Sequence, residues 1–458
     1  MEWRVSANHI LKGGDIMAFS AETGERLWTA PCHEGFNSPV DLFVAQGKVW
    51  SGVLAWKRQP GITEVYDLQT GQVAARRPPD QKTYTIGFGH ARCYRHKATS
   101  QYVIQGRSGV EFIDMSSDRV IANHWVRGTC QYGILPANGL LYAPPHSCAC
   151  YITAKLHSFN ALAATPQGRR EQTHPTERGP AYESALDTRP STRDTSDWPT
   201  YRHDPARSGA TPASLSASLG PAWARKLQGP LSPVVVAAGR LYVAQPEAHT
   251  LHALDAKDGS ALWQFTAGGR VDSPPTVHGG RVYFGSADGW VYCVRAEDGA
   301  LAWRFRAAPE SRQIVSYGQL ESPWPVPGNV LVVPHPERGP HPLALAAAGR
   351  SSYVDGGVYL HVLDGVTGQA LASRRISHRD PETGLEPQKA IRGVSMPGAK
   401  PDVLSTDGTS VFMRHQRFDF RANPLKQNVD HLFSSAGFLD DTWWHRAYWQ
   451  VGTRMGGG

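Results

Sequence analysis

Ala253-Leu254-Asp255-Ala256-Lys257-Asp258-Gly259, followed at a short interval by Trp263, is the stretch that decides the fold, because the chain repeats it. Forty residues further on, Asp298-Gly299 is followed at the same interval by Trp303. Shorter forms of the pattern occur three more times, at Thr23-Gly24 to Trp28, Asp67–Gly71 to Ala75, and Asp364–Gly368 to Ala372. A period near forty, with a glycine turn between short apolar runs, is typical of a radial array of β-sheets.

Each full repeat predicts four short strands. A Ser-Pro step such as Ser273-Pro274 is followed by Gly-x-apolar-apolar strands such as 280–284, and the runs alternate apolar and polar residues with the period of strands. We therefore predict an all-β propeller with eight blades, each a four-stranded antiparallel sheet, incomplete at the termini. The predicted blades are a partial one ending near 30, then 37–78, 88–127, 130–163, 231–267, 271–307, 321–375 and an incomplete one from 392.

Two segments interrupt the repeats. Residues 164–220 are rich in Pro, Ser, Thr and Arg, so we expect an exposed linker or insertion between a first half, 1–163, and a second half, 221–458. Residues 334–350 are rich in proline where a strand should run, and we expect the blade to be locally disrupted there because proline cannot donate to a central ladder.

Composition limits the function. The net charge is +7, but the basic residues are scattered, so we expect no specific nucleic-acid partner. No apolar run approaches the roughly 20 residues that a membrane-spanning helix needs, so no transmembrane segment is expected. No signal peptide is visible at Met1; the chain begins almost inside a repeat and ends inside another, so the sequence leaves open whether it is a piece of a longer protein.

The repeat resembles that of the pyrroloquinoline-quinone (PQQ)-type β-propellers, the quinoprotein alcohol dehydrogenase-like fold. The stretch Asp197-Trp198-Pro199-Thr200-Tyr201-Arg202-His203-Asp204, with Ser208-Gly209, also resembles the opening motif common in that superfamily. The resemblance implies a bacterial, extracytoplasmic (periplasmic) protein. It leaves two functions open, which are a binding or interaction scaffold and a quinoprotein-type dehydrogenase that uses PQQ and calcium.

Quinone-binding members of the family typically have two adjacent cysteines, whereas the nearest approach here is Cys148-Ala149-Cys150. We therefore interpret the chain as a scaffold rather than an enzyme, with an unknown cofactor, and with a protein partner or a small polar ligand at the mouth of the channel. In the dehydrogenase alternative, the resemblance makes Asp272, Glu321 and Asn37 the oxygen ligands of calcium, with Arg392 over the quinone carboxylates.

The loops that enter the innermost strands of a propeller meet at one rim, which is a common place for ligands. In this chain these entries are unusually polar. The ligand-binding candidates there are Asn37, His90, Arg92, Arg127, Gln131, Asp272, Glu321 and Arg392. Such a ring is either a set of mutually paired charges at a wet mouth or a site for a polar, sugar-like or anionic ligand. The aromatic residues Tyr132, Tyr317 and Trp324 lie near the same rim by the same argument, either as ligand platforms or as packing.

A second group of candidates is rich in cysteine. By the same argument, Cys93, Cys130, His146, Cys148 and Cys150 face one side of neighbouring blades. Three readings stay open for this group: structural thiols or disulfides, a zinc-like metal site, or accidental proximity. No Cys-x-x-Cys pair, serine nucleophile elbow or phosphate-binding glycine loop is present, so no catalytic residue is predicted.

Overall fold

The structure is a computed structural model that describes residues 2–4, 14–32, 41–52, 64–76, 96–106, 109–117, 119–145, 150–164, 175–184, 197–334, 341–388, 396–439 and 449–454. Within these residues the chain is almost entirely β-structure, with two single-turn 3-10 segments, η1 (Ile152–Ala154) and η2 (Pro246–Ala248). All strand pairs are antiparallel, and most join strands that follow one another in the chain. The predicted all-β class is therefore confirmed.

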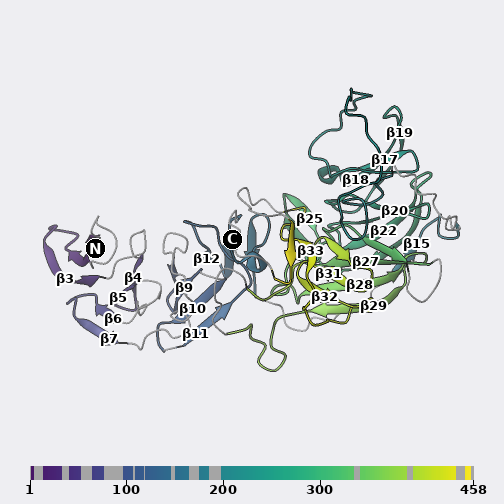
Figure 1. Ribbon diagram of the computed structural model, residues 1–458. Coiled ribbons are helices and arrows are strands. Elements are labelled where there is room, and N and C mark those ends of the chain that lie inside the picture. Colours follow the sequence, from purple (N-terminus) through teal and green to yellow (C-terminus); the bar gives the residue numbers. More distant parts are fainter. Residues whose placement is uncertain are drawn as a thin grey trace.

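The first half of the chain forms four sheets, which follow one another along the row at the purple and blue end of Figure 1. They are β1 (Glu2–Arg4), β2 (Gly14–Phe19) and β3 (Arg26–Cys32); β4 (Asp41–Ala45), β5 (Lys48–Gly52), β6 (Glu64–Asp67) and β7 (Val73–Arg76); β8 (Lys97–Ala98), β9 (Tyr102–Gln105), β10 (Val110–Asp114) and β11 (Val120–Asn123); and β12 (Leu135–Ala137), β13 (Leu140–Ala143) and β14 (Asn160–Leu162).

The second half forms six sheets, drawn from teal to yellow in Figure 1. They are β16 (Val235–Ala237), β17 (Arg240–Gln245), β18 (Thr250–Asp255) and β19 (Ala261–Thr266); β20 (Thr276–His278), β21 (Arg281–Gly285), β22 (Trp290–Arg295) and β23 (Leu301–Arg306), joined by β15 (Thr176–Arg178); β24 (Ile314–Ser316) and β25 (Gln319–Glu321); β26 (Leu331–Pro334), β27 (Pro342–Ala348), β28 (Val358–Asp364) and β29 (Ala370–Ile376); β30 (Leu404–Thr406), β31 (Val411–Met413) and β32 (Gln416–Phe418); and β33 (His431–Ser434) and β34 (Trp449–Gly452).

The expected four-stranded blade is present in some repeats only. The sheets β4–β7, β8–β11, β16–β19 and β26–β29 have four strands, whereas the sheet of β20–β23 gains β15 as a fifth strand. β15 comes from the segment that the sequence marks as a linker or insertion. The sheets β1–β3, β12–β14 and β30–β32 have three strands among the described residues, so the number of eight blades stays a prediction.

The prediction of a disrupted blade at 334–350 is wrong for the residues that the structure describes. Pro334 and Pro342 face each other as the last pair of the β26–β27 hairpin, and residues 335–340 between them lie outside the described residues. From Pro342 to Ala348, every residue of β27 is buried. The prolines stand at strand ends, where a missing N–H removes no central ladder bond.

The repeated turn has one backbone geometry at six places. In the turn at Asp255, the backbone N–H of Asp255 donates to the carbonyl of Ser260, and the N–H of Gly259 donates to the carbonyl of Asp255. The same two bonds form in the turns that begin at Ser20, Asp67, Arg295, Asp364 and Asp380. The closing glycines, with φ between +66° and +74°, are Gly24, Gly71, Gly259, Gly299, Gly368 and Gly384. Only glycine adopts this left-handed conformation without steric cost.

Tryptophans connect one sheet to the next through these turns. The indole Nε1 of Trp263, on β19, donates to the carbonyl of Ala296 at 2.9 Å, in the turn between β22 and β23 of the neighbouring sheet. A Cβ on Gly299 in the same turn would lie 2.6 Å from the indole. The indole of Trp263 therefore packs between two sheets, and Gly299 is required both for the turn and for the close approach of the ring.

Three other indoles occupy the same position on other turns. Trp28 donates to the carbonyl of Leu68 at 3.0 Å, Trp223 to that of Ala256 at 3.1 Å, and Trp303 to that of Gly365 at 3.3 Å. A Cβ on the corresponding glycines, Gly71, Gly259 and Gly368, would lie 2.5 Å from the ring in each case. Burial of four indoles in this way contributes a large apolar area to the sheet-to-sheet packing.

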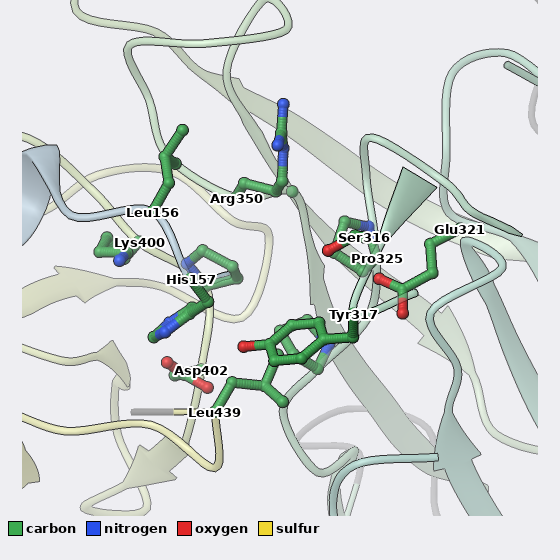
Figure 2. Close-up of a pocket in the computed structure, with 13 residues that line it drawn as sticks. Leu156, His157, Ser316, Tyr317, Glu321, Pro325, Arg350, Lys400, Asp402 and Leu439 are labelled. Atoms are coloured by element: carbon green, nitrogen blue, oxygen red, sulfur yellow. The ribbon is translucent and has the colours of Figure 1, made fainter. Parts of the chain in front are cut away.

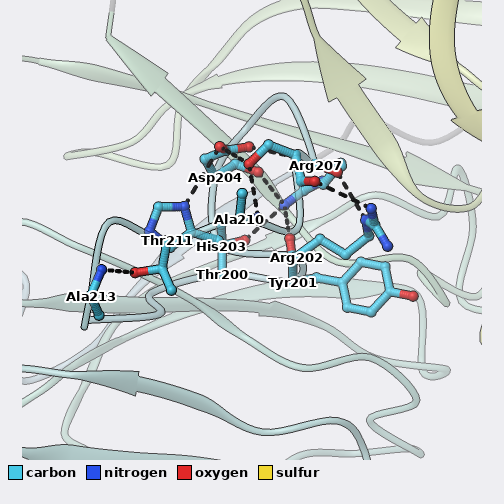
Figure 3. A network of polar contacts seen from close by, with 10 residues as sticks. Thr200, Tyr201, Arg202, His203, Asp204, Arg207, Ala210, Thr211 and Ala213 are labelled. Carbon is cyan, nitrogen blue, oxygen red and sulfur yellow. Dashed lines mark hydrogen bonds and ion pairs between the residues drawn. The ribbon is translucent and has the colours of Figure 1, made fainter. Parts of the chain in front are cut away.

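The opening motif at 197–209 connects sheets. Figure 3 shows the polar contacts among its own residues. Arg207 is fully buried; its Nη1 donates to Thr200 Oγ1 at 2.9 Å, and its Nε donates to the carbonyl of Leu404, on β30, at 2.9 Å. Thr200 in turn contacts Thr276 Oγ1, on β20, at 2.8 Å. Burial lowers the pKa of Arg207 to about 9. This motif therefore has a structural role, because it joins three parts of the chain through buried polar contacts.

Candidate functional site

An arginine and two carboxylates form a buried cluster between two sheets. Arg270 and Asp272 lie in the loop from β19 to β20, and Glu321 ends β25. Arg270 Nε lies 2.9 Å from Asp272 Oδ1, and Arg270 Nη1 lies 2.6 Å from Glu321 Oε1. The second contact joins opposite charges without an aligned hydrogen bond. All three residues are at most 7% exposed, so one guanidinium faces two carboxylates away from water.

Burial changes the proton affinity of this cluster. Removal from water and, to a smaller extent, the neighbouring charge of Asp272 raise the pKa of Glu321 to about 7, against the opposing charge of Arg270. Burial also raises the pKa of the Asp272 carboxyl, against its hydrogen bond to Arg270. Near neutral pH, Glu321 therefore exchanges a proton, because two full negative charges cannot be stabilised by one guanidinium in this environment.

The cluster lies beside a cavity that several loops enclose (Figure 2). Glu321 and Tyr317 line one wall, and the ring of Tyr317 covers the guanidinium of Arg270 at 3.9 Å. His157 and Asp402 line the opposite side, and in Figure 2 both side chains lie to the left of the hydroxyl of Tyr317. The cavity encloses about 470 Å³, including the part that is open to solvent. Loops from both halves of the chain contribute to it.

The charged side chains that line this cavity form ion pairs and hydrogen bonds with other residues of the chain. Arg350 Nη2 lies 2.6 Å from Asp355 Oδ2, and Arg350 Nη1 donates to Asn160 Oδ1 at 3.1 Å. Asp402 is paired with Arg414 at 2.6 Å. Lys400 Nζ donates to the backbone carbonyl of Lys155. The side chains are thus positioned before any ligand arrives, which favours binding because less conformational entropy is lost.

The structure brings two of the eight predicted ligand residues together. Asp272 and Glu321 meet on Arg270, as the rim argument predicts. Arg127 is instead buried, with its guanidinium 5.4 Å from the ring of Tyr151, and its backbone N–H donates to Ala154. Gln131 is exposed in a turn, with φ of +73°. Asn37, His90, Arg92 and Arg392 lie outside the described residues.

The predicted aromatic residues separate into three environments. Tyr317 lines the cavity, whereas Trp324 is buried as packing and donates to the carbonyl of Asp355 at 3.0 Å. Tyr132 is 73% exposed and lines a second, shallow apolar groove over β12–β14. Only Tyr317 therefore stands beside the charged cluster.

Five residues of the site were not predicted from the sequence. Arg270 lies two positions before Asp272, and its basic charge was the available signal. His157 lies between β13 and β14, and Arg350 lies between β27 and β28, so a rule based on blade entry could not select them. Lys400 and Asp402 lie in the loop that enters β30, and the rule placed that blade entry earlier, at Arg392.

The cysteine candidates are only partly described. Cys130 and Cys150 are both half-buried, and Cys150 packs against the cluster of Tyr151, Ala154, Tyr353 and Met396. Cys93, His146 and Cys148 lie outside the described residues. Across the part of the chain that the structure describes, no three His, Cys, Asp or Glu side chains are placed to hold a metal ion.

The described candidates for calcium do not fit that ion. Calcium takes six to eight oxygen ligands. Asp272 and Glu321 instead both direct their oxygens at the guanidinium of Arg270, which occupies the place that a cation would take. Both carboxylates are already paired with this guanidinium, so we derive no chemistry through calcium or a quinone.

The antiparallel sheets and the repeated turn-and-indole contacts can now be compared with known proteins. Residues 205–393 match the model of a PQQ-type family that is described as outer membrane protein assembly factor BamB. The match confirms the resemblance to PQQ-type repeats. No helix among the described residues is long and apolar enough to cross a membrane.

Two curated relatives carry the same description. BamB of Salmonella typhimurium (strain LT2) is 34% identical over 100 residues, which are 19% of this chain and 25% of the relative. BamB of Moranella endobia (strain PCIT) is 35% identical over 82 residues, which are 18% of this chain and 21% of the relative. The chain thus spans a quarter or less of the length of these relatives.

Solved structures show more distant similarity. A quinohemoprotein alcohol dehydrogenase, ADHIIG from Pseudomonas putida HK5, is 20% identical, with a TM-score of 0.36 over 47% of this chain and 34% of that one. BamB from Moraxella catarrhalis is 16% identical, with a TM-score of 0.21 over 42% of this chain and 67% of that one. Both TM-scores are below 0.5.

Proposed function

We propose that this chain is a PQQ-type β-propeller scaffold outside the cytoplasm that binds a partner protein through the cavity beside Arg270 and Glu321. The observation that carries the proposal is the cavity itself, whose charged side chains are already held by ion pairs and hydrogen bonds within the chain. Relatives described as assembly factors favour a protein partner, and the fit test disfavours the dehydrogenase alternative. A small polar ligand is the second occupant that this lining would accept.

We also propose that the halves 1–163 and 221–458 form one body, with 164–220 as their connection. Contacts between the two halves support a single body. The amide of Gln388 pairs with both the N–H and the carbonyl of Ala122, at 2.9 and 2.7 Å, as a neighbouring strand would. Ser351 Oγ donates to the carbonyl of Thr153 at 3.0 Å.

Site-specific photocrosslinking in the native host tests the proposed function. A benzophenone amino acid replaces Tyr317, which is 40% exposed at the cavity, and in a control it replaces Leu425, which is 38% exposed away from it. We expect a discrete crosslinked protein from position 317 and none from position 425. Native mass spectrometry of the same preparation would show a retained small ligand. If position 317 gives no more adduct than the control and no ligand is retained, the proposal is wrong.

A further inference from the structure

The carboxylates of the cavity face its interior, whereas the guanidinium groups that pair with them lie behind. Glu321 and Asp402 line the cavity, and in Figure 2 their side chains lie on opposite sides of the Tyr317 ring. The arginines that pair with them, Arg270 and Arg414, are not among the described residues that line it. The ring of Tyr317 covers the guanidinium of Arg270 at 3.9 Å. A group that enters the cavity therefore meets carboxylate oxygens before it meets a guanidinium.

The basic side chains of the lining are directed elsewhere. Figure 2 shows the guanidinium of Arg350 pointing away from Glu321, and Arg350 Nη2 pairs with Asp355 at 2.6 Å. Lys400 Nζ donates to the backbone carbonyl of Lys155. An anionic occupant would compete with contacts that the chain already makes, whereas a cationic occupant would meet hydrogen-bond acceptors.

Glu321 is the acceptor that a cation in the cavity would stabilise most. It shares Arg270 with Asp272, so the three charges sum to −1 when both carboxylates are ionised. The place between the two carboxylates is taken by Arg270, and a further cation would reach Glu321 alone, from the side of the cavity. Glu321 Oε1 is buried and makes no aligned hydrogen bond. A positive charge here would bring the sum to zero, and burial reduces the screening of such a pair.

We propose that the partner protein inserts a lysine or arginine side chain into this cavity, where its cationic group binds the carboxylate of Glu321. The inference rests on the function proposed above and adds the chemistry of the partner's contact. An ammonium or guanidinium group donates to a carboxylate in charge-assisted hydrogen bonds, which are about twice as strong as neutral ones. Arginine in a desolvated pocket is also typical of the residues that dominate the binding energy of an interface.

Binding of this cation is coupled to the loss of a proton. Burial raises the pKa of Glu321 to about 7 in the free protein, so about a tenth of the molecules carry the carboxylate at about pH 6 and about nine-tenths at about pH 8. The cation binds the ionised form, so its affinity should rise about tenfold between these pH values. The other titratable and charged groups around Glu321 and across the cavity are Arg270, Asp272, His249, Tyr317, Arg350, His157, Lys400 and Asp402.

Small ligands test the chemistry of the cavity on the purified full-length chain. The probe is n-butylamine, which is cationic over this pH range; n-butanol is its neutral counterpart and butyrate its anionic counterpart. Ligand-observed NMR titrations give the three affinities. We expect saturable binding of n-butylamine alone, about tenfold tighter at about pH 8 than at about pH 6.

Two variants assign this binding to Glu321. Glu321→Gln should bind n-butylamine weakly at both pH values, and it keeps the other titratable groups, so any pH dependence that survives in it belongs to them. Glu177→Gln, which alters a surface pair with Arg304, should behave as the wild type. Equal binding of the amine and the alcohol, tighter binding of butyrate, or amine binding that Glu321→Gln leaves unchanged would overturn the inference.

Photocrosslinking shows whether the partner makes this contact. Benzophenone at position 317 is combined with Glu321→Gln or with Glu177→Gln in the native host. We expect the adduct to fall about tenfold with Glu321→Gln and to persist with Glu177→Gln. Mass spectrometry should find a lysine or arginine close to the crosslinked residue of the partner.

The crosslinking results separate this inference from the proposed function. An adduct that persists undiminished with Glu321→Gln, or a crosslinked segment without a basic residue, would leave the partner site in place and show that the basic contact is wrong. Absence of any adduct at position 317 when Glu321 is intact would refute the proposed function, and the inference with it.

Discussion

Replacing Glu321 by glutamine isolates the effect of its buried carboxyl on stability. Burial raises the pKa of Glu321 from 4.5 to about 7 in the folded protein. The folded protein therefore holds this proton more tightly than the unfolded chain does. The resulting stability is fully present below pH 4.5 and is lost as the pH rises through about 7. The loss from this one group amounts to about 3 kcal/mol.

Urea unfolding followed by tryptophan fluorescence, at several pH values from about 5 to about 8, measures this contribution. Glu321→Gln cannot ionise, so its stability should fall less with rising pH than that of the wild type. The difference between the two proteins should change by about 2–3 kcal/mol over the range. Glu177→Gln is the control, because the Glu177 carboxylate pairs with Arg304 at the surface. Parallel profiles for wild type and Glu321→Gln would refute the assignment of a buried, proton-sharing carboxyl.

Three further predictions concern the packing and the cofactor. Gly299→Ala should destabilise the fold by about 2–4 kcal/mol, since the added Cβ meets Trp263. Gly239→Ala is the control: Gly239 has a similar positive φ but open space around it, so its substitution should cost about 1 kcal/mol. Equal losses of the free energy of unfolding in urea would contradict the packing of the indole on Gly299. Arg207→Ala should lower the free energy of unfolding by about 3 kcal/mol, because it leaves buried carbonyls without a donor. A loss below about 1 kcal/mol would show that the opening motif does not hold the sheets together. Equilibrium dialysis with PQQ and calcium should show no saturable binding, and saturation would contradict the fit argument at Arg270.

The repeat pattern predicted the fold because it records a local requirement. Where one sheet packs on the next, the contact needs a glycine with positive φ, and a tryptophan follows the turn at a fixed distance, so both residues recur in the sequence. Trp223 escaped this reading because no Asp-x-x-x-Gly turn precedes it, although its indole fills the same position. The sixth turn, Asp380–Gly384, was also missed, although it has the same Asp-x-x-Thr-Gly pattern as the turns at Asp67 and Asp364.

The site was less predictable, because its partners depend on tertiary contacts. The position of Asp272 and Glu321 at blade entries indicated that they converge, and they do. Nothing in the spacing showed that Arg270 would lie between them and exclude a cation. In the same way, β15 lies in a segment whose composition is typical of a linker, and it becomes a strand only because β23 offers a free edge.

The most direct test of the central claim, that indoles docked on glycine turns join the sheets, is a double-mutant cycle between Trp263→Ala and Gly299→Ala. If the ring stacks on the glycine, the added methyl should cost about 1 kcal/mol once the indole is gone, which gives a coupling free energy of about 1–3 kcal/mol in urea unfolding. Additive effects of the two substitutions, with no measurable coupling, would contradict the claim.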